Sequence, residues 1–229
     1  MALTAALSVL LGACGGQTAS PSPPITSCCD PTAPPVELTI YAAASLKGAL
    51  EEVKSRYEAL SEVVTLVIST DSSAALEAKI EQGAPADVFL SADTANPQKL
   101  VDGGFATEPV MTFASNKLTV IVPTDNPGGL ASPRDLIKPG VKVIAAGPTV
   151  PITTYARQLL ENLAKENGYP ADFPTQYAAN VMSEEENVAA VVAKIELGQG
   201  DAAIVYVTDA ATSTGVQSIE ISPSSNVAA

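Results

Sequence analysis

The 229-residue sequence predicts an α/β fold. From residue 36 onward, short runs rich in Val, Ile and Leu alternate with stretches of helical periodicity, an order typical of parallel βαβ units. Hydrophobic residues make up 46% of the chain but aromatic residues only 4%. The core therefore has to be built mainly from Ala, Val, Leu and Ile, which suits close packing of helices on sheets.

The predicted elements follow in order from these patterns. Strands are expected at residues 37–41, 63–69, 87–91, 118–122, 141–145, 202–207 and 216–221. Helices are expected at 46–60, 74–82, 96–102, from Ser132-Pro133, at 153–166 and ending near Leu197. In the first helix, apolar residues recur at steps of four and three. Gly83 ends the second helix in a position that favours positive φ.

Composition excludes several classes of function. Lys and Arg total 12 against 25 Asp and Glu, a formal charge of −13, which argues against nucleic acid because phosphates are bound through cations. The chain has no His, and its three Cys all precede residue 30. A Cys/His metal site, a Cys nucleophile in the fold and a His-dependent triad are thus excluded. No cofactor is expected.

An enzyme is also not expected, because the motifs that would support one are missing. The chain has no G-x-S-x-G stretch, and Ser45-Leu46-Lys47 has the wrong spacing for S-x-x-K. Gly198-Gln199-Gly200 lacks the third glycine of a dinucleotide-binding loop and follows a predicted helix.

The N-terminus predicts export. Residues 1–13 form an apolar run that is too short for the ~20 residues of a membrane span and is typical of a secretory signal. The run ends in Leu11-Gly12-Ala13-Cys14, which resembles the lipobox of bacterial lipoproteins and implies a lipid anchor on Cys14. A plain signal peptide is the alternative. Residues 15–35, rich in Ser, Thr and Pro, predict a disordered linker, and the protein is expected to be lipid-anchored or periplasmic.

Two junctions between a strand and a helix attract attention, because ligands of open α/β sheets bind at the carboxyl ends of strands. Ser45 follows the first predicted strand, and Ser72-Ser73 follow the second. Serine at such a position is often a helix cap. It can also form an anion site together with the unpaired N–H groups of the helix start. The junctions alone leave both interpretations open.

Four segments add a family resemblance: residues 38–46 (LTIYAAASL), 82–93 (QGAPADVFLSAD), 147–151 (GPTVP) and 203–206 (AIVY). In this order the chain resembles the periplasmic molybdate-binding proteins of ABC importers over about residues 36–222. The resemblance implies a two-lobed periplasmic-binding-protein-like fold, each lobe a mainly parallel sheet flanked by helices. Lobe 1 would span 36–114 and lobe 2 115–222, with 223–229 starting a crossover back to lobe 1.

The resemblance also implies a function and a site. The chain would be a monomer that captures molybdate or tungstate between the lobes and delivers it to a membrane permease, with the oxyanion as ligand rather than cofactor. Such a site uses neutral donors. Carried over by position, the hydroxyl and backbone donors fall on Ser45 and Ser73, the backbone N–H donors on Ile152 and Val188, and the phenolic donor on Tyr206.

The sequence departs from the family pattern in three ways. Ile152 stands where the family usually has a small residue. Ser183 and Glu186 could form a capping box, which would start the helix early and use up the Val188 N–H. The donor role that the resemblance implies for Val188 requires a later start, so we expect the helix to begin near Glu186 or Asn187. The family continues for roughly another 40 residues by resemblance, which is within normal lobe sizes, so lobe 1 is expected to be incomplete.

Three alternatives remain. The chain could be a receptor for another tetrahedral oxyanion, such as sulfate or phosphate, with Asp71 as the nearby acceptor for a phosphate proton. It could be an enzyme, for which a turnover assay would be needed. It could be a passive surface lipoprotein or adhesin, which no anion would stabilise.

Overall fold

The computed structural model describes residues 34–61, 63–107 and 109–229. The predicted signal, Cys14 and all but the last two residues of the 15–35 linker lie outside the described residues. None of the helices in these ranges combines the length and the apolarity that crossing a bilayer takes.

The first of two sheets has three strands in the order β2-β1-β3. They are β1 (Val36–Ala43), β2 (Val64–Asp71) and β3 (Val88–Leu90). Both pairs are parallel, as predicted, and β1 and β2 are aligned along their whole length. Ala43 and Asp71 therefore end side by side, at the edge of the sheet where each strand leads into a helix.

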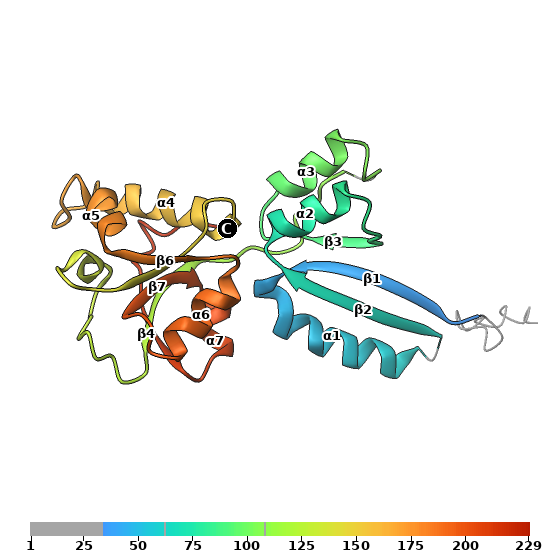
Figure 1. The fold of residues 1–229 in the computed structure, drawn as a ribbon, viewed down its shortest axis with the longest axis horizontal. Helices are drawn as coiled ribbons and strands as arrows, with labels where there is room; N and C mark the ends of the chain where they lie inside the picture. Colours follow the sequence, from blue (N-terminus) through green and yellow to red (C-terminus); the bar gives the residue numbers. More distant parts are fainter. Residues whose placement is uncertain (1–33, 62, 108) are drawn as a thin grey trace, which may run out of the picture. The chain divides into compact units, whose positions relative to one another are not determined.

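Helices cover both faces of this sheet (Figure 1). A 3₁₀ turn, η1 (Ala44–Leu46), and α1 (Lys47–Leu60) follow β1; α2 (Ser73–Glu81) follows β2; and α3 (Ala95–Asp102) follows β3. Because β2 and β3 pair with opposite sides of β1, right-handed crossovers place α1 and α2 on opposite faces. Asp87 fixes the approach to β3, since its Oδ2 accepts the Thr39 N–H of β1 at 2.8 Å.

The second sheet has five strands in the order β6-β5-β7-β4-β8. They are β4 (Leu118–Pro123), β5 (Val143–Ala146), β6 (Val181–Glu185), β7 (Ala202–Tyr206) and β8 (Val216–Ile219). β5 runs parallel to β6 and β7, but β4 is antiparallel to both β7 and β8. This sheet is thus mixed in its pairing, but β5, β6, β7 and β8 all run in one direction and only β4 is reversed, so the expectation of a mainly parallel sheet is confirmed. β4 enters between two parallel strands from the opposite direction, which the spacing of apolar runs does not reveal.

Most of the core lies around this second sheet. Its helical elements are η2 (Pro133–Ile137), α4 (Pro151–Leu163), α5 (Phe173–Asn180), α6 (Val188–Glu196) and α7 (Val207–Thr212). Every residue of β4 and β7 is buried, as expected for central strands covered on both faces. The core of the first sheet is much smaller, formed by Ile40, Ala42, Leu50 and Leu66.

Three elements were not predicted from the sequence: α5, β6 and α7. The sequence of β6 ends in two of three consecutive glutamates, a pattern more typical of a solvated surface than of a strand. The strand is possible because β6 is at the edge of the sheet, where Met182 and Glu184 face solvent in alternation with half-buried neighbours.

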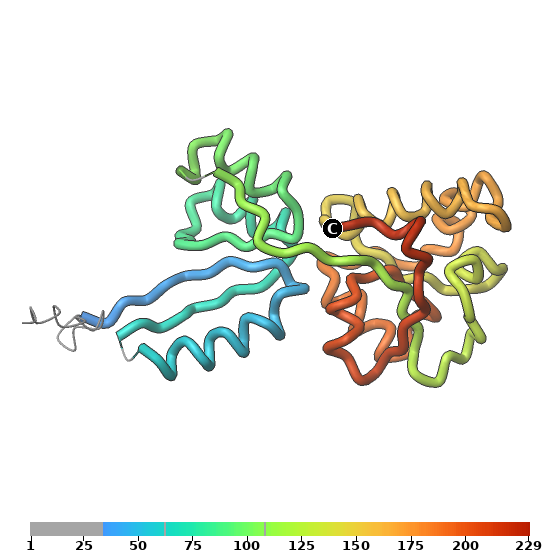
Figure 2. The backbone as a smooth tube through the Cα atoms, turned by 180° about the vertical axis from the view of Figure 1, so that it is seen from behind, coloured from blue at the N-terminus to red at the C-terminus, as the bar shows by residue number. Residues whose placement is uncertain are grey.

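Only one described segment connects the two sheets. The chain leaves α3 and reaches β4 through residues 103–107 and 109–117, drawn in green in Figure 2. At its end, Asn116 and Lys117 pair with the last residues of the chain, with the Asn116 N–H donating to the Ala229 carbonyl at 2.7 Å.

Candidate functional site

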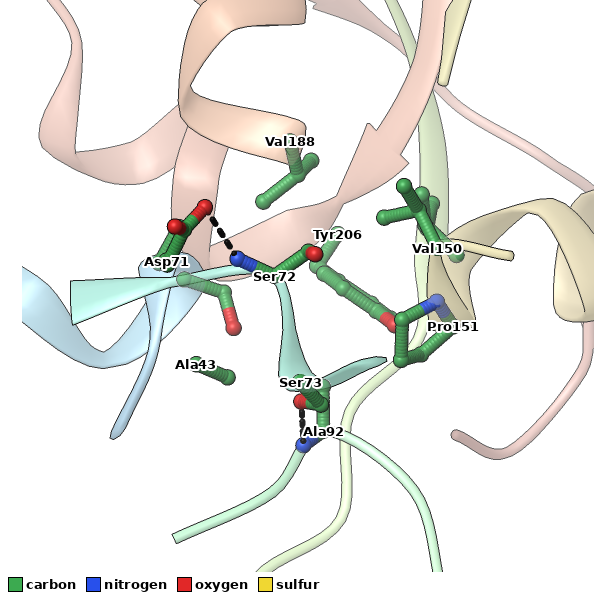
Figure 3. Close-up of a pocket in the computed structure, with 12 residues that line it drawn as sticks. Ala43, Asp71, Ser72, Ser73, Ala92, Val150, Pro151, Val188 and Tyr206 are labelled. Atoms are coloured by element: carbon green, nitrogen blue, oxygen red, sulfur yellow. Dashed lines mark hydrogen bonds between the residues drawn. The ribbon is translucent and has the colours of Figure 1, made fainter. Parts of the chain in front are cut away.

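A small pocket lies where strands of both sheets end (Figure 3). Six strands contribute to it through their carboxyl ends or the residues that follow: β1, β2, β3, β5, β6 and β7. Its free volume is about 10 Å³, close to the space that one water molecule needs. All five predicted ligand positions line it: Ser45, Ser73, Ile152, Val188 and Tyr206.

The first sheet contributes three serines from two strand ends. Ser45 is the middle residue of η1, and its hydroxyl has no partner among the described residues. Ser72 caps α2, because its hydroxyl oxygen accepts the Ala75 N–H at 3.2 Å. Ser73 is fully buried, and its oxygen accepts the Ala92 N–H at 2.9 Å (Figure 3). The Ser73 hydroxyl therefore keeps its own proton for donation.

Asp71 is the one charged residue among those that line the pocket. Its Oδ1 accepts the Ser72 N–H at 2.8 Å, and its Oδ2 lies 3.1 Å from the Lys79 Nζ. Burial would raise the pKa of this carboxyl, but these bonds, with a weaker one from Asn187, together hold the pKa below its usual value. Asp71 is therefore ionised at neutral pH, and one of its oxygens already has two donors.

The second sheet contributes the start of α4. Pro151 is the first residue of this helix, and its missing N–H costs nothing there. The Thr153 hydroxyl anchors the helix start to the end of β5 by donating to the carbonyls of Ala146 and Gly147 at 2.9 and 2.8 Å. Ile152 follows Pro151, so its N–H has no acceptor within the helix. The Ile152 side chain is buried in the core of the second sheet.

The start of α6 confirms the later of the two expected beginnings. Asn187 is the N-cap, with its Oδ1 accepting the Ala190 N–H at 3.0 Å, and Val188 is the first helical residue. Ser183 lies in β6 instead, where its hydroxyl donates to Glu185. The Val188 N–H, placed in the first turn, has no acceptor in the helix, and Val188 is one of the residues that line the pocket.

Tyr206 ends β7 and is 3% exposed. Its hydroxyl oxygen is the one buried side-chain N or O atom without a hydrogen-bond partner among the described residues. An unsatisfied group of this kind costs roughly 1–3 kcal/mol. Burial, reinforced by Tyr155, Asp209 and Asp93, raises the pKa of this phenol far above its usual value. The hydroxyl therefore keeps its proton and acts as a donor at any physiological pH.

Asp209 supports Tyr206 from α7. Its Oδ2 accepts the Tyr206 backbone N–H at 3.2 Å, and the residue is 8% exposed. Burial raises the pKa of this carboxyl to about 6, although the bond from Tyr206 lowers it in part. A second aromatic ring, Tyr155, meets Tyr206 edge to face with centroids 6.3 Å apart.

One residue of the site, Asn187, was not predicted from the sequence. Ser72 lines the pocket beside Ser73, and it is the residue of the Ser72-Ser73 pair that caps α2. Asn187 touches the first sheet through Asp71, with 3.4 Å between its Nδ2 and the Asp71 Oδ1. No sequence pattern could have revealed this contact, because the residues are 116 positions apart.

The chemistry of the pocket suits an anion with several acceptor oxygens. Its walls offer N–H groups from the first turns of α4 and α6 and hydroxyls from Ser45, Ser73 and Tyr206, and none of its twelve lining residues is Lys or Arg. Helix starts with unpaired N–H groups attract negative charge. Among the described residues no group of three or more His, Cys, Asp or Glu is arranged to hold a metal ion.

Two sheets with such a pocket at their strand ends are the arrangement of a ligand-binding protein of the α/β class. The chain belongs to the family described as bacterial extracellular solute-binding protein, which it matches over residues 38–229. It is 32% identical over 200 residues to the molybdate-binding protein ModA of Mycobacterium tuberculosis H37Rv, covering 87% of this chain and 70% of that protein.

Two further relatives agree with this family. The putative ABC transporter substrate-binding lipoprotein YvgL of Bacillus subtilis is 31% identical over 186 residues, which cover 81% of this chain and 68% of YvgL. The structure of the Azotobacter vinelandii periplasmic molybdate-binding protein superposes with a TM-score of 0.63 at 26% identity, covering 77% of this chain and 75% of that one. The α/β fold with two helix-flanked sheets, predicted from the sequence, is confirmed.

Asp209 makes the stability of the protein depend on pH. The folded chain holds the Asp209 proton up to about pH 6, whereas the unfolded chain releases it near 3.8. Because the folded state then binds more protons, the free energy of unfolding falls as the pH rises from about 4 to 6. Asp209→Asn removes this loss, so relative to the unmodified protein it should gain up to about 3 kcal/mol between pH 4 and pH 7.

Urea unfolding of both proteins at pH 4, 5, 6 and 7 measures this difference. Asp209→Ala is the matched control, because it also removes the titration but loses the bond to the Tyr206 N–H as well. Like Asp209→Asn, Asp209→Ala should lack the fall in the free energy of unfolding between pH 4 and pH 6, but it should be less stable than Asp209→Asn at each pH. A difference between Asp209→Asn and the unmodified protein that stays constant over this range would contradict the assignment.

Proposed function

We propose that this protein is the substrate-binding component of an ABC importer that captures molybdate or tungstate in the pocket and delivers it to a membrane permease. The observation that carries the proposal is the buried Tyr206 hydroxyl, which has no hydrogen-bond partner in the part of the chain that the structure describes, in a pocket with two helix starts. The name and 32% identity of the mycobacterial ModA support molybdate as the ligand.

The donor set of the pocket favours a fully deprotonated tetrahedral dianion as the ligand. Ser45, Ser73, Ile152, Val188 and Tyr206 would each donate to an oxyanion oxygen through a hydroxyl or a backbone N–H. Binding would thus supply the partner that the Tyr206 hydroxyl lacks. Neutral donors bind the acceptor oxygens without a cation. An excess of acidic residues, here a net charge of −13, is therefore compatible with binding of an anion in the pocket.

Discrimination against phosphate follows from the same donors. A phosphate ion that carries a proton brings a donor of its own into the pocket, and a donor that faces a donor leaves both unsatisfied at roughly 1–3 kcal/mol. Asp71 is the one carboxylate at hand to accept such a proton, and its oxygens already accept from Ser72, Lys79 and Asn187. Sulfate shares the charge and shape of molybdate, so it would be excluded by size alone.

Entry of the ion requires movement. The free volume of the pocket is about 10 Å³, the space of about one water, whereas a tetrahedral oxyanion brings four oxygens. We therefore assign residues 36–114 and 115–222 to two lobes that separate to admit the ion and close around it. Hinge closure of this kind is common where a ligand lies between two domains.

Anchoring at Cys14 is the further part of the proposal. The Leu11-Gly12-Ala13-Cys14 stretch has the form of a lipobox, and the description of YvgL as a lipoprotein supports the same arrangement here. A lipidated monomer outside the cytoplasm would present its lobes to the permease while the 15–35 segment acts as a tether.

Lipid attachment is tested by expressing the full chain in a bacterial host. The unmodified protein should be found in the membrane fraction, and Cys14→Ser should release it from that fraction. Replacing Cys28 and Cys29 with Ser is the control and should leave the protein in the membrane fraction. Equal partition of all three proteins would remove Cys14 as the anchor.

Calorimetric titration of the full chain with molybdate, tungstate, sulfate and phosphate tests the ligand. Heat of binding is expected for molybdate and tungstate, with affinities at least about 100-fold above those for sulfate and phosphate, a difference of about 2.8 kcal/mol. Preference for sulfate or phosphate would establish the alternative receptor. Silence with all four ions would contradict an oxyanion receptor.

Tyr206→Phe separates binding from stability. The change removes the hydroxyl that the ion would satisfy, so molybdate affinity should fall by about 10- to 100-fold, the range of a bond to a charged group. The melting temperature of the ion-free protein should stay level or rise, because an unsatisfied buried group has been removed.

Two comparisons accompany this variant. Tyr155→Phe removes a phenolic hydroxyl that does not line the pocket and should bind molybdate like the unmodified protein. Ser45→Ala should weaken binding without unfolding the protein. If Tyr206→Phe kept full affinity, the phenol would not be a ligand.

A further inference from the structure

One polar contact joins the two sides of the pocket. Among the described residues, the bond between the Asn187 Nδ2 and the Asp71 Oδ1 is the only hydrogen bond or ion pair that connects residues 34–107 with residues 109–229. It joins the end of β2 to the N-cap of α6, and Asp71 lines the pocket itself.

The Asp71 side of this contact is held in place. Its carboxylate accepts the Ser72 N–H at 2.8 Å and lies 3.1 Å from the Nζ of Lys79, the seventh residue of α2. Its side chain is 27% exposed, so water competes for it only in part. The orientation of Asp71 is therefore fixed by the same helix start that presents Ser72 and Ser73 to the pocket.

Asn187 uses both polar atoms of its planar side-chain amide. The Oδ1 accepts the Ala190 N–H at 3.0 Å and caps α6, while the Nδ2 points to Asp71. Because the amide is rigid, capping the helix sets the direction of the second bond. Ser or Asp would also cap the helix, but neither has an N–H donor for Asp71.

The length of the contact makes it sensitive to the distance between the two walls. At 3.4 Å it lies at the long end of hydrogen-bond geometry, so a small separation of the walls would break it. The contact persists only while the end of β2 and the N-cap of α6 stay about this close to each other.

We propose that Asp71 and Asn187 are a positioning pair that sets the two walls of the pocket against each other and aligns the Val188 N–H with the serines opposite. This inference rests on the proposed function, since the aligned groups are the proposed oxyanion donors. Asn187 acts through Val188, its direct neighbour, and Asp71 acts through the start of α2.

The pair also explains why a carboxylate is tolerated beside an anion site. Asp71 repels a dianion in the pocket, so replacing it alone would remove both the repulsion and the link between the walls. A single Asp71 variant therefore cannot decide the question. Exchange of the two residues can, because it keeps the total charge and restores an amide opposite a carboxylate.

The test uses the full chain and molybdate as the probe. Asn187→Asp keeps a good cap but places two carboxylates face to face, so molybdate affinity should fall by at least about tenfold, or about 1.4 kcal/mol. The exchange variant, Asp71→Asn with Asn187→Asp, should recover to within about threefold of the unmodified protein. Ala189→Asp adds the same charge at an exposed position in the same helical turn and is the matched control.

A second readout needs no ligand. Melting temperatures of the two single variants and the exchange variant form a double-mutant cycle. Contacting residues couple, so the exchange variant should melt at least about 2 °C above the sum of the single effects. A residue that only capped α6 would give additive shifts.

The outcomes separate the two hypotheses. If the unmodified chain binds none of the four oxyanions, the proposed function fails, and the pair is judged by the melting cycle alone. Additive melting shifts, an exchange variant as weak as Asn187→Asp, or an equal loss in Ala189→Asp would each overturn the positioning pair. Recovery in the exchange variant together with non-additive melting would establish it.

Discussion

The convergence of strand ends on one pocket is the constraint on which the rest of this structure depends. Parallel strands that lead into helices point their carboxyl ends in one direction, so the helices that follow begin along one edge. Here β1, β2 and β3 do so in one sheet and β5, β6 and β7 in the other. The first turns of α4 and α6, the cap of α2 and the end of β7 thereby meet around a volume of about 10 Å³.

This geometry lets an acidic protein offer a favourable place to an anion. The net charge of −13 acts over long distances, where salt screens it within about 8–10 Å. Inside the pocket the field comes from nearby N–H and O–H dipoles and from the helix starts. The unsatisfied Tyr206 hydroxyl adds a local cost that a bound ligand would remove, so part of the stability of the ion-free protein is given up for binding.

Much of the fold could be predicted from the sequence, and the exceptions have physical reasons. Central strands and amphipathic helices were found because burial imposes a period on their residues. β6 was missed because an edge strand tolerates Glu184, and the reversed direction of β4 was missed because burial on both faces looks the same in either direction. The start of α6 was predicted at its observed place from the family resemblance, against the local capping pattern of Ser183 and Glu186.

The five site positions were predicted to come together, and they line one pocket; their roles as ligands stay a proposal. The sequence could not reveal the contacts that hold the pocket residues in place. The Asp71–Asn187 bond and the support of Tyr206 by Asp209 depend on the relative placement of elements far apart in the chain or on burial.

Two of the proposed donors are main-chain groups, and this has a consequence for how the site can change during evolution. The N–H groups of Ile152 and Val188 are present whatever side chain those positions carry, and only proline would remove them. Their side chains pack in the core of the second sheet, so these positions can be substituted together with other core residues without loss of the N–H donors. A site of this kind is inherited as the position of two helix starts, so its history is better traced by superposing backbones than by comparing residue identities.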